Sequence, residues 1–125
     1  MMPPVEMLRR LVEMESPTGD ATRMSHIRSF LAAELTALGG DASRHGEHLL
    51  ARFGEQRAGE TIVIVAHMDT VWPAGTLQRM PFSVSGDLAH GPGALDMKGG
   101  IVVMLEAIRR SEAPSRPLAV LLTAD

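Results

Sequence analysis

Two short stretches of continuously apolar residues, IVIVA at 62–66 and LAVLL at 118–122, constrain the fold more than any other feature of the sequence. Strands covered on both faces have this pattern, whereas strands with one solvent-exposed face alternate apolar and polar residues. A helical pattern lies between the two stretches, and a strand–helix–strand order favours parallel pairing with a right-handed crossover. The sequence therefore predicts an α/β fold with a mainly parallel sheet covered by helices, in which residues 62–66 form a central strand.

Two amphipathic helices are predicted before the first of these strands, because apolar residues recur there at helical spacing. The first helix begins after Pro3 and ends before Pro17, since proline is tolerated in a first helical turn but disfavours helical geometry in the residue before it. The second helix begins near Thr22 and stops at Gly39 and Gly40.

A third helix is predicted at residues 99–110, between the two apolar strands. Val102 and Val103 widen its apolar face, so we expect this helix to be well buried. Shorter elements are also predicted: a strand at 49–53, a hairpin at 81–90 and a loop at 113–117.

The composition excludes several classes of function. A net charge of -3 and a pI near 5.9 give no electrostatic case for binding nucleic acid or an anionic membrane. The longest apolar runs have about five residues, far fewer than the roughly 20 that a membrane span needs. The first residues, MMPPVEMLRR, also lack the apolar region of a signal peptide, so a cytoplasmic location is expected. The sequence has no Cys, and a metal ion would therefore need His and carboxylate ligands.

Such side chains follow the first apolar strand and precede the third helix. His67 and Asp69 come directly after residues 62–66, and Asp96 stands in the glycine-rich segment HGPGALDMKGG. Imidazole suits zinc, and a carboxylate can share two ions. We expect His67 to bind a metal while Asp69 accepts a hydrogen bond from its other ring nitrogen. Asp125 ends the second apolar strand, so it should lie on the same rim of the sheet.

Simpler interpretations remain open for each of these residues. An isolated His-x-Asp is more often a loop histidine near a capping aspartate, and an aspartate before a helix is often only its N-cap. Phosphate binding by the glycine-rich segment is disfavoured, because neither GxGxxG nor the P-loop order occurs in the sequence. The other histidines are expected at the surface or in turns: His26, His45, His48 and His90.

Taken together, three segments resemble the amino-terminal part of the co-catalytic zinc metallopeptidases. The segments are AHMDTVWPAG, PFSVSGDLAHGPGALDMKGG and LAVLLTAD, in that order. This family includes glutamate carboxypeptidase, acetylornithine deacetylase, succinyl-diaminopimelate desuccinylase, aminoacylases and dipeptidases. The GPG and PAGTL stretches are most similar to the glutamate carboxypeptidase branch.

The resemblance implies a role for each candidate residue. His67 matches the family's zinc-binding histidine, Asp69 its catalytic carboxylate, and Asp96 the aspartate that bridges two zinc ions (Zn2+), with a cis peptide bond often following the bridging residue. The implied activity is hydrolysis of amide or peptide bonds in N-acyl amino acids or peptides, by two-metal activation of water. The sequence leaves open whether the metal is zinc, Co2+ or Mn2+. The family also implies a homodimer for the complete protein.

In the family, the general-base glutamate and a further zinc ligand follow a strand that ends much like LLTAD, and the sequence stops at Asp125. We therefore expect residues 1–125 to be the amino-terminal part of one catalytic α/β domain that is incomplete at its C-terminal end. By this expectation the dimerisation domain and the rest of the catalytic domain are absent, and the fragment alone is inactive. The alternative is a non-catalytic binding or interaction module derived from the same fold.

Overall fold

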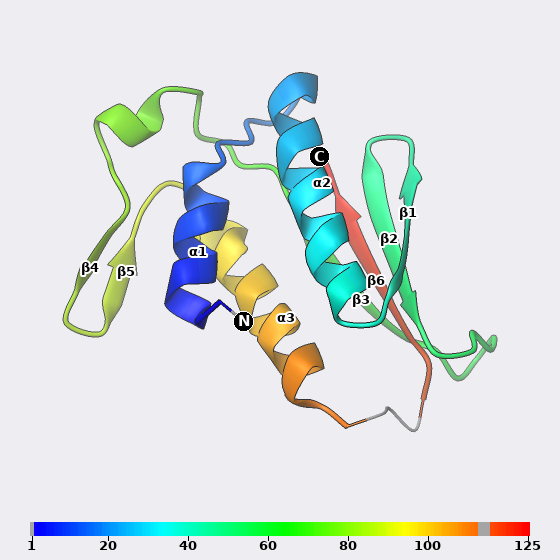
Figure 1. The fold of residues 1–125 in the computed structure, drawn as a ribbon. Coiled ribbons are helices and arrows are strands. Elements are labelled where there is room, and N and C mark those ends of the chain that lie inside the picture. Colours follow the sequence, from blue (N-terminus) through cyan, green and yellow to red (C-terminus); the bar gives the residue numbers. More distant parts are fainter. Residues whose placement is uncertain (1, 113–115) are drawn as a thin grey trace.

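A computed structural model of the chain describes residues 2–112 and 116–125 (Figure 1). In chain order, the described elements are α1 (Pro4–Glu13), α2 (Ala21–Ala37), β1 (Asp41–His45), β2 (His48–Phe53), β3 (Ile62–His67), the short helix η1 (Thr76–Gln78), β4 (Ser83–Ser85), β5 (Leu88–His90), the helical turn η2 (Ala94–Lys98), α3 (Gly99–Arg110) and β6 (Leu118–Thr123).

Four strands form one sheet with the order β1-β2-β6-β3. β3 pairs with β6 in parallel, with His67 opposite Thr123, whereas β1–β2 and β2–β6 are antiparallel pairs. The predicted α/β class is confirmed, but the expectation of a mainly parallel sheet is corrected. A two-residue turn, Gly46 and Glu47, joins β1 to β2, and so short a turn can connect only antiparallel neighbours. β1 itself was not predicted, because DASRH has no apolar pattern.

The two continuously apolar strands differ in their positions. β6 lies between β2 and β3, as its pattern predicts, and Val120 and Leu122 are fully buried. β3 is at an edge of the sheet, and Val63 and Val65 are 59% and 61% exposed. The prediction that residues 62–66 form a central strand covered on both faces was therefore wrong, because among the described residues β3 has a strand partner on one side only and three of its side chains, Ile62, Val63 and Val65, are exposed.

The three predicted helices are present. α2 begins one residue before Thr22, and Asp20 caps it by accepting a hydrogen bond from the Arg23 N–H at 3.0 Å. α3 has the predicted bounds, but Val103 is 69% exposed while Val102 is buried, so the apolar face is narrower than expected. The hairpin of β4 and β5 and the strand at 49–53 are confirmed. Residues 113–115 of the predicted loop lie outside the described residues.

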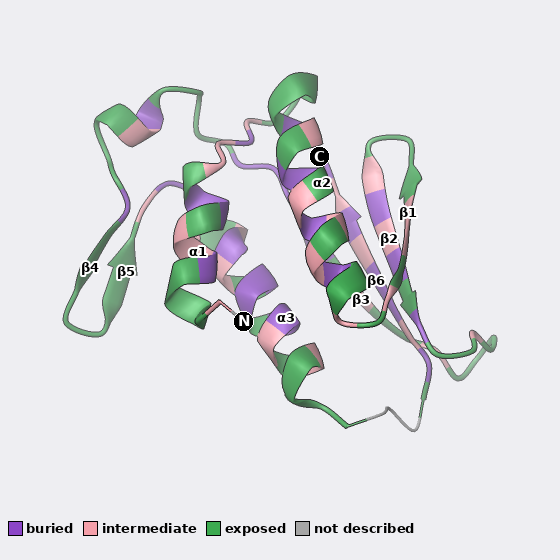
Figure 2. Ribbon diagram, in the orientation of Figure 1, coloured by how far each residue is buried: buried purple, intermediate pink, exposed green. Residues whose placement is uncertain are grey.

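The core lies where the helices meet the sheet. α2 packs against β1 and β2, and α1 packs against α3. Figure 2 shows buried residues on all three helices and on β2 and β6. The apolar side chains that are 0% exposed come from all of these elements and from Met68 just after β3: Leu11, Ile27, Leu31, Leu35, Ala51, Met68, Ile101, Val120 and Leu122. Among the described residues, none of the helices has the length and apolar content that crossing a membrane requires.

Candidate metal centre

The candidate site lies at the carboxyl end of β3. His67 is the last residue of this strand, and the Met68 N–H continues the pairing by donating to the Thr123 carbonyl of β6 at 2.7 Å. The carboxyl ends of β3 and β6 therefore meet on one rim, as predicted, and Asp125 follows two residues after Thr123. Asp69 lies just beyond the strand and is 7% exposed.

Asp96 reaches this rim from η2, which precedes α3. The turn before η2 depends on Gly93, which has a positive φ of 81° and lies so close to Thr70 that a Cβ atom would approach its Cγ2 to 2.6 Å. Only glycine allows both the backbone conformation and this approach. The peptide bond from Asp96 to Met97 is cis, as the family resemblance implied.

His67 links the two loops through its two ring nitrogens. Its Nε2 lies 2.9 Å from Oδ1 of Asp96, whose side chain is 79% exposed. Its Nδ1 lies 2.8 Å from the main-chain carbonyl oxygen of Asp69 and 3.3 Å from the Asp69 carboxylate Oδ1. The expected hydrogen bond from the ring to the Asp69 carboxylate is thus made chiefly to the main-chain oxygen of the same residue.

These contacts raise the pKa of the His67 imidazole above its ordinary value. Partial burial acts in the opposite direction, but the hydrogen bonds to the Asp69 carbonyl and the Asp96 carboxylate, together with the two negative charges, outweigh it. The ring is therefore surrounded by acceptors, an environment that attracts a proton or a metal cation.

Sequence reasoning missed three residues that support the site. The Thr18 hydroxyl donates to Oδ2 of Asp69. Lys98 is 1% exposed, and its Nζ donates to the Met14 carbonyl at 2.9 Å. The Glu15 carboxylate accepts hydrogen bonds from the N–H groups of Gly75 and Leu77 and so holds the loop that follows Asp69. In the sequence, the turn segment SPTGD and the lysine of DMKGG are the only features that mark these residues. Neither feature predicts which group the side chain contacts in the folded protein.

The predicted ligand set is small. Within residues 2–112 and 116–125, no three His, Cys, Asp or Glu side chains gather closely enough to hold a metal ion among them.

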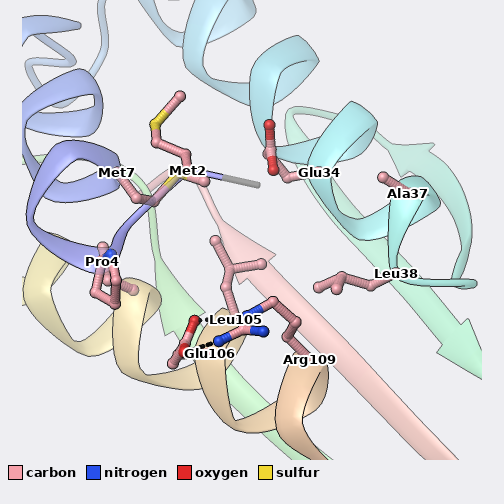
Figure 3. Close-up of a pocket in the computed structure, with 10 residues that line it drawn as sticks. Met2, Pro4, Met7, Glu34, Ala37, Leu38, Leu105, Glu106 and Arg109 are labelled. Carbon is pink, nitrogen blue, oxygen red and sulfur yellow. Dashed lines mark hydrogen bonds and ion pairs between the residues drawn. The ribbon is translucent and has the colours of Figure 1, made fainter.

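His48, which was expected at the surface, accepts a hydrogen bond at Nδ1 from the Ala124 N–H at 3.1 Å. The apolar pocket in Figure 3 lies elsewhere, between α1, α2 and α3, and none of the predicted site residues lines it.

Comparison with known proteins identifies the family. The sequence profile of peptidase family M20/M25/M40 matches residues 63–125, the half of the chain that carries His67, Asp69 and Asp96. The chain belongs to this family. The resemblance found in the three sequence segments is therefore confirmed.

Individual members of the family are similar over most of the chain. Carboxypeptidase G2 of Pseudomonas sp. (strain RS-16) is 37% identical over an alignment of 112 residues that covers 84% of this chain and 27% of that protein. Succinyl-diaminopimelate desuccinylase of Anaplasma marginale is 31% identical over 132 residues, covering 98% of this chain and 33% of that protein. The chain thus spans about a quarter to a third of the length of these family members.

A solved structure confirms the fold. An M20 family metallo-carboxypeptidase from Sulfolobus solfataricus superposes with a TM-score of 0.77 at 17% identity, covering 99% of this chain and 31% of that one. The α/β architecture is thus that of the family.

Proposed function

We propose that the protein is a metal-dependent hydrolase that cleaves amide or peptide bonds in small N-acyl amino acids or peptides. The observation that supports this most is the 2.9 Å approach of His67 Nε2 to Asp96 Oδ1 at an exposed point of the sheet rim. Relatives named as a carboxypeptidase and a desuccinylase favour the same reaction class.

The donor atoms fit a divalent metal ion. An imidazole nitrogen and a carboxylate oxygen are the ligands that zinc takes in sites without cysteine. A catalytic zinc site needs about three protein ligands, so His67 and Asp96 would supply only part of the set. We infer that further ligands complete the site, since the chain spans only about a quarter to a third of the length of carboxypeptidase G2 and the desuccinylase. Zinc is the proposed metal, with Co2+ and Mn2+ as alternatives.

The main chain prepares His67 for this role. A carbonyl oxygen only accepts hydrogen bonds, so the bond from His67 Nδ1 to the Asp69 carbonyl places the ring proton on Nδ1. In the neutral ring, Nε2 then carries the free lone pair and faces Asp96. Asp69 lies behind the ring, where its charge favours a cation on the Nε2 side.

Asp96 is proposed as the bridging ligand, because its exposed carboxylate has two oxygens and only one of them contacts His67. When bound, a pair of divalent ions supplies Lewis-acid polarisation of the substrate carbonyl and a water of lowered pKa. The whole protein is proposed to form a homodimer, as its family resemblance implies. A non-catalytic module is the weaker candidate, since all three candidate side chains are present and His67 contacts both Asp69 and Asp96.

Isothermal titration calorimetry with Zn2+ tests the proposal directly. The protein titrated is the whole protein, because His67 and Asp96 alone do not complete the site. We expect it to bind Zn2+ and its Asp96→Asn variant to bind Zn2+ about 10–100-fold more weakly, because a charged ligand oxygen is lost. Asp87→Asn is the matched control, since Asp87 is exposed in the turn of the β4–β5 hairpin and lies in another loop. Absence of Zn2+ binding by the whole protein, or hydrolysis of N-acyl amino acids that persists in its Asp96→Ala variant, would contradict the proposed site.

A further inference from the structure

The segment between α1 and α2, residues 16–20, lies along the start of the loop that carries Asp69. The Thr70 N–H donates to the Ser16 carbonyl at 2.8 Å, and the Thr18 N–H donates to the Thr70 carbonyl at 3.0 Å. Pro17 and Thr70 form a parallel bridge between the two segments. We call residues 16–20 the strap. These bonds use main-chain atoms only, so they hold the strap against the loop even when the Thr18 hydroxyl is removed.

Two hydroxyl groups extend from the strap, and they have different partners. The Ser16 hydroxyl is buried and donates to the main-chain carbonyl of Met68 at 2.7 Å. The Thr18 hydroxyl donates to the Asp69 carboxylate at Oδ2 and also lies 3.2 Å from the Thr70 carbonyl. A hydroxyl has one proton, and a charged carboxylate is the stronger acceptor, so the bond to Asp69 is favoured.

The Asp69 carboxylate depends on few contacts. The residue is 7% exposed, and Oδ1 is the buried side-chain oxygen that has no hydrogen-bond partner among the described residues. This Oδ1 lies 3.3 Å from His67 Nδ1. The bond that Thr18 makes to Oδ2 therefore selects the side-chain rotamer in which Oδ1 faces the imidazole.

We infer that Thr18 is a positioning residue for the site, which fixes Asp69 so that its carboxylate charge is presented to His67. The inference rests on the proposed function for its consequence, because a correctly placed Asp69 strengthens metal binding through His67. Thr18 itself contacts neither His67 nor Asp96. It acts through Asp69 alone, and its hydroxyl is the group that matters.

Three variants separate the hydroxyl from the strap. Thr18→Val removes the hydroxyl and keeps the side-chain shape, and Thr18→Ser keeps the hydroxyl. Ser16→Ala is the matched control, because it removes the other strap hydroxyl, whose partner is a main-chain carbonyl. Thr18→Ala is a second hydroxyl-free variant that guards against an effect of the added valine methyl group.

The first measurement uses the metal-free chain, so it is independent of the proposed function. NMR scalar couplings report whether the Asp69 side chain occupies one χ1 rotamer. We expect one rotamer in the wild type, Thr18→Ser and Ser16→Ala, and averaging over several in Thr18→Val and Thr18→Ala. An unchanged single rotamer in both hydroxyl-free variants would overturn the inference.

The second measurement is the Zn2+ affinity of the whole protein, with the visible spectrum of the Co2+-loaded protein as a report on ligand geometry. Loss of an outer-shell partner of a metal ligand typically weakens metal binding by about 10–100-fold. Because Thr18 acts on such a partner, Asp69, and not on a ligand, we expect Thr18→Val to weaken binding by about tenfold, the lower end of this range, with recovery in Thr18→Ser. Equal losses in Ser16→Ala and Thr18→Val would overturn the inference by assigning the effect to the strap as a whole. If the wild type bound no metal, the proposed function would fail, and the rotamer measurement would still decide the role of Thr18.

Discussion

Lys98 is the single lysine of the sequence, and its charged end is buried against the C-terminal end of α1. Burial lowers the pKa of this ammonium group from 10.5 to about 8, and the negative charge of Glu15 opposes the shift only in part. The chain contains neither Tyr nor Cys, so few other groups titrate between these two pH values. Alkaline pH therefore isolates the contribution of one side chain to folding.

We expect the wild type to become more stable as the pH rises from 8 to 10.5. In this window the unfolded chain keeps the Lys98 proton and the folded chain has lost it, so the free energy of unfolding increases with pH, by roughly 3 kcal/mol in total. Urea unfolding at several pH values measures this rise, and Lys98→Met, which cannot titrate, should lack it. If the free energy of unfolding changed with pH in the same way for the wild type and for Lys98→Met, the burial of a charged lysine would be contradicted.

At the scale of elements, the site depends on how closely two turns pack. Gly93 precedes η2, and the position of its missing Cβ lies 2.6 Å from Thr70 Cγ2, in the turn after β3. Gly59 has nearly the same φ, 80° against 81°, but no atom lies within 4 Å of its Cβ position. The two glycines therefore separate backbone strain from close packing.

Gly93→Ala should destabilise the fold by more than about 1 kcal/mol beyond the loss in Gly59→Ala. Both variants place an alanine at positive φ, but only the first also forces Thr70 away. Urea unfolding of the two variants and the wild type at one pH gives the comparison. Equal losses would mean that the two turns can separate without cost, and the contact would then not position Asp96.

At the scale of the whole molecule, β3 exposes an apolar surface. It lies at the edge of the sheet, and Ile62, Val63 and Val65 are 48%, 59% and 61% exposed. An exposed apolar edge strand can pair with the same edge of another molecule, because its outer N–H and C=O groups have no strand partner.

We expect the purified chain to self-associate in a concentration-dependent way, and Val65→Lys to reduce this association because a lysine on an edge strand opposes pairing. Sedimentation velocity at several protein concentrations provides the measurement. Val103→Lys is the control, since Val103 is 69% exposed but lies on α3. A wild type that stays monomeric throughout, or an equal effect of both lysines, would contradict association through β3.

The sequence by itself determined the elements whose signals are local. Helical spacing located α1, α2 and α3 to within a few residues, and apolar runs located β3 and β6. Three short segments in a fixed order, AHMDTVWPAG, PFSVSGDLAHGPGALDMKGG and LAVLLTAD, indicated the family, and the profile match to residues 63–125 confirms it. Such patterns depend only on neighbours along the chain, so they can be recognised without knowledge of the tertiary structure.

Only the tertiary structure decided the features that depend on distant segments. The apolar pattern of β3 is the same at an edge as at the centre of a sheet, so sequence could not show that Val65 is exposed. Thr18 and Asp69 are 51 residues apart, and Lys98 and Met14 are 84 apart. The choice of a main-chain carbonyl as the His67 partner depends on how the loop bends after β3. The Thr18 and Lys98 contacts form only when the strap and the end of α1 pack against the segments that carry Asp69 and Lys98, and no local pattern encodes that approach.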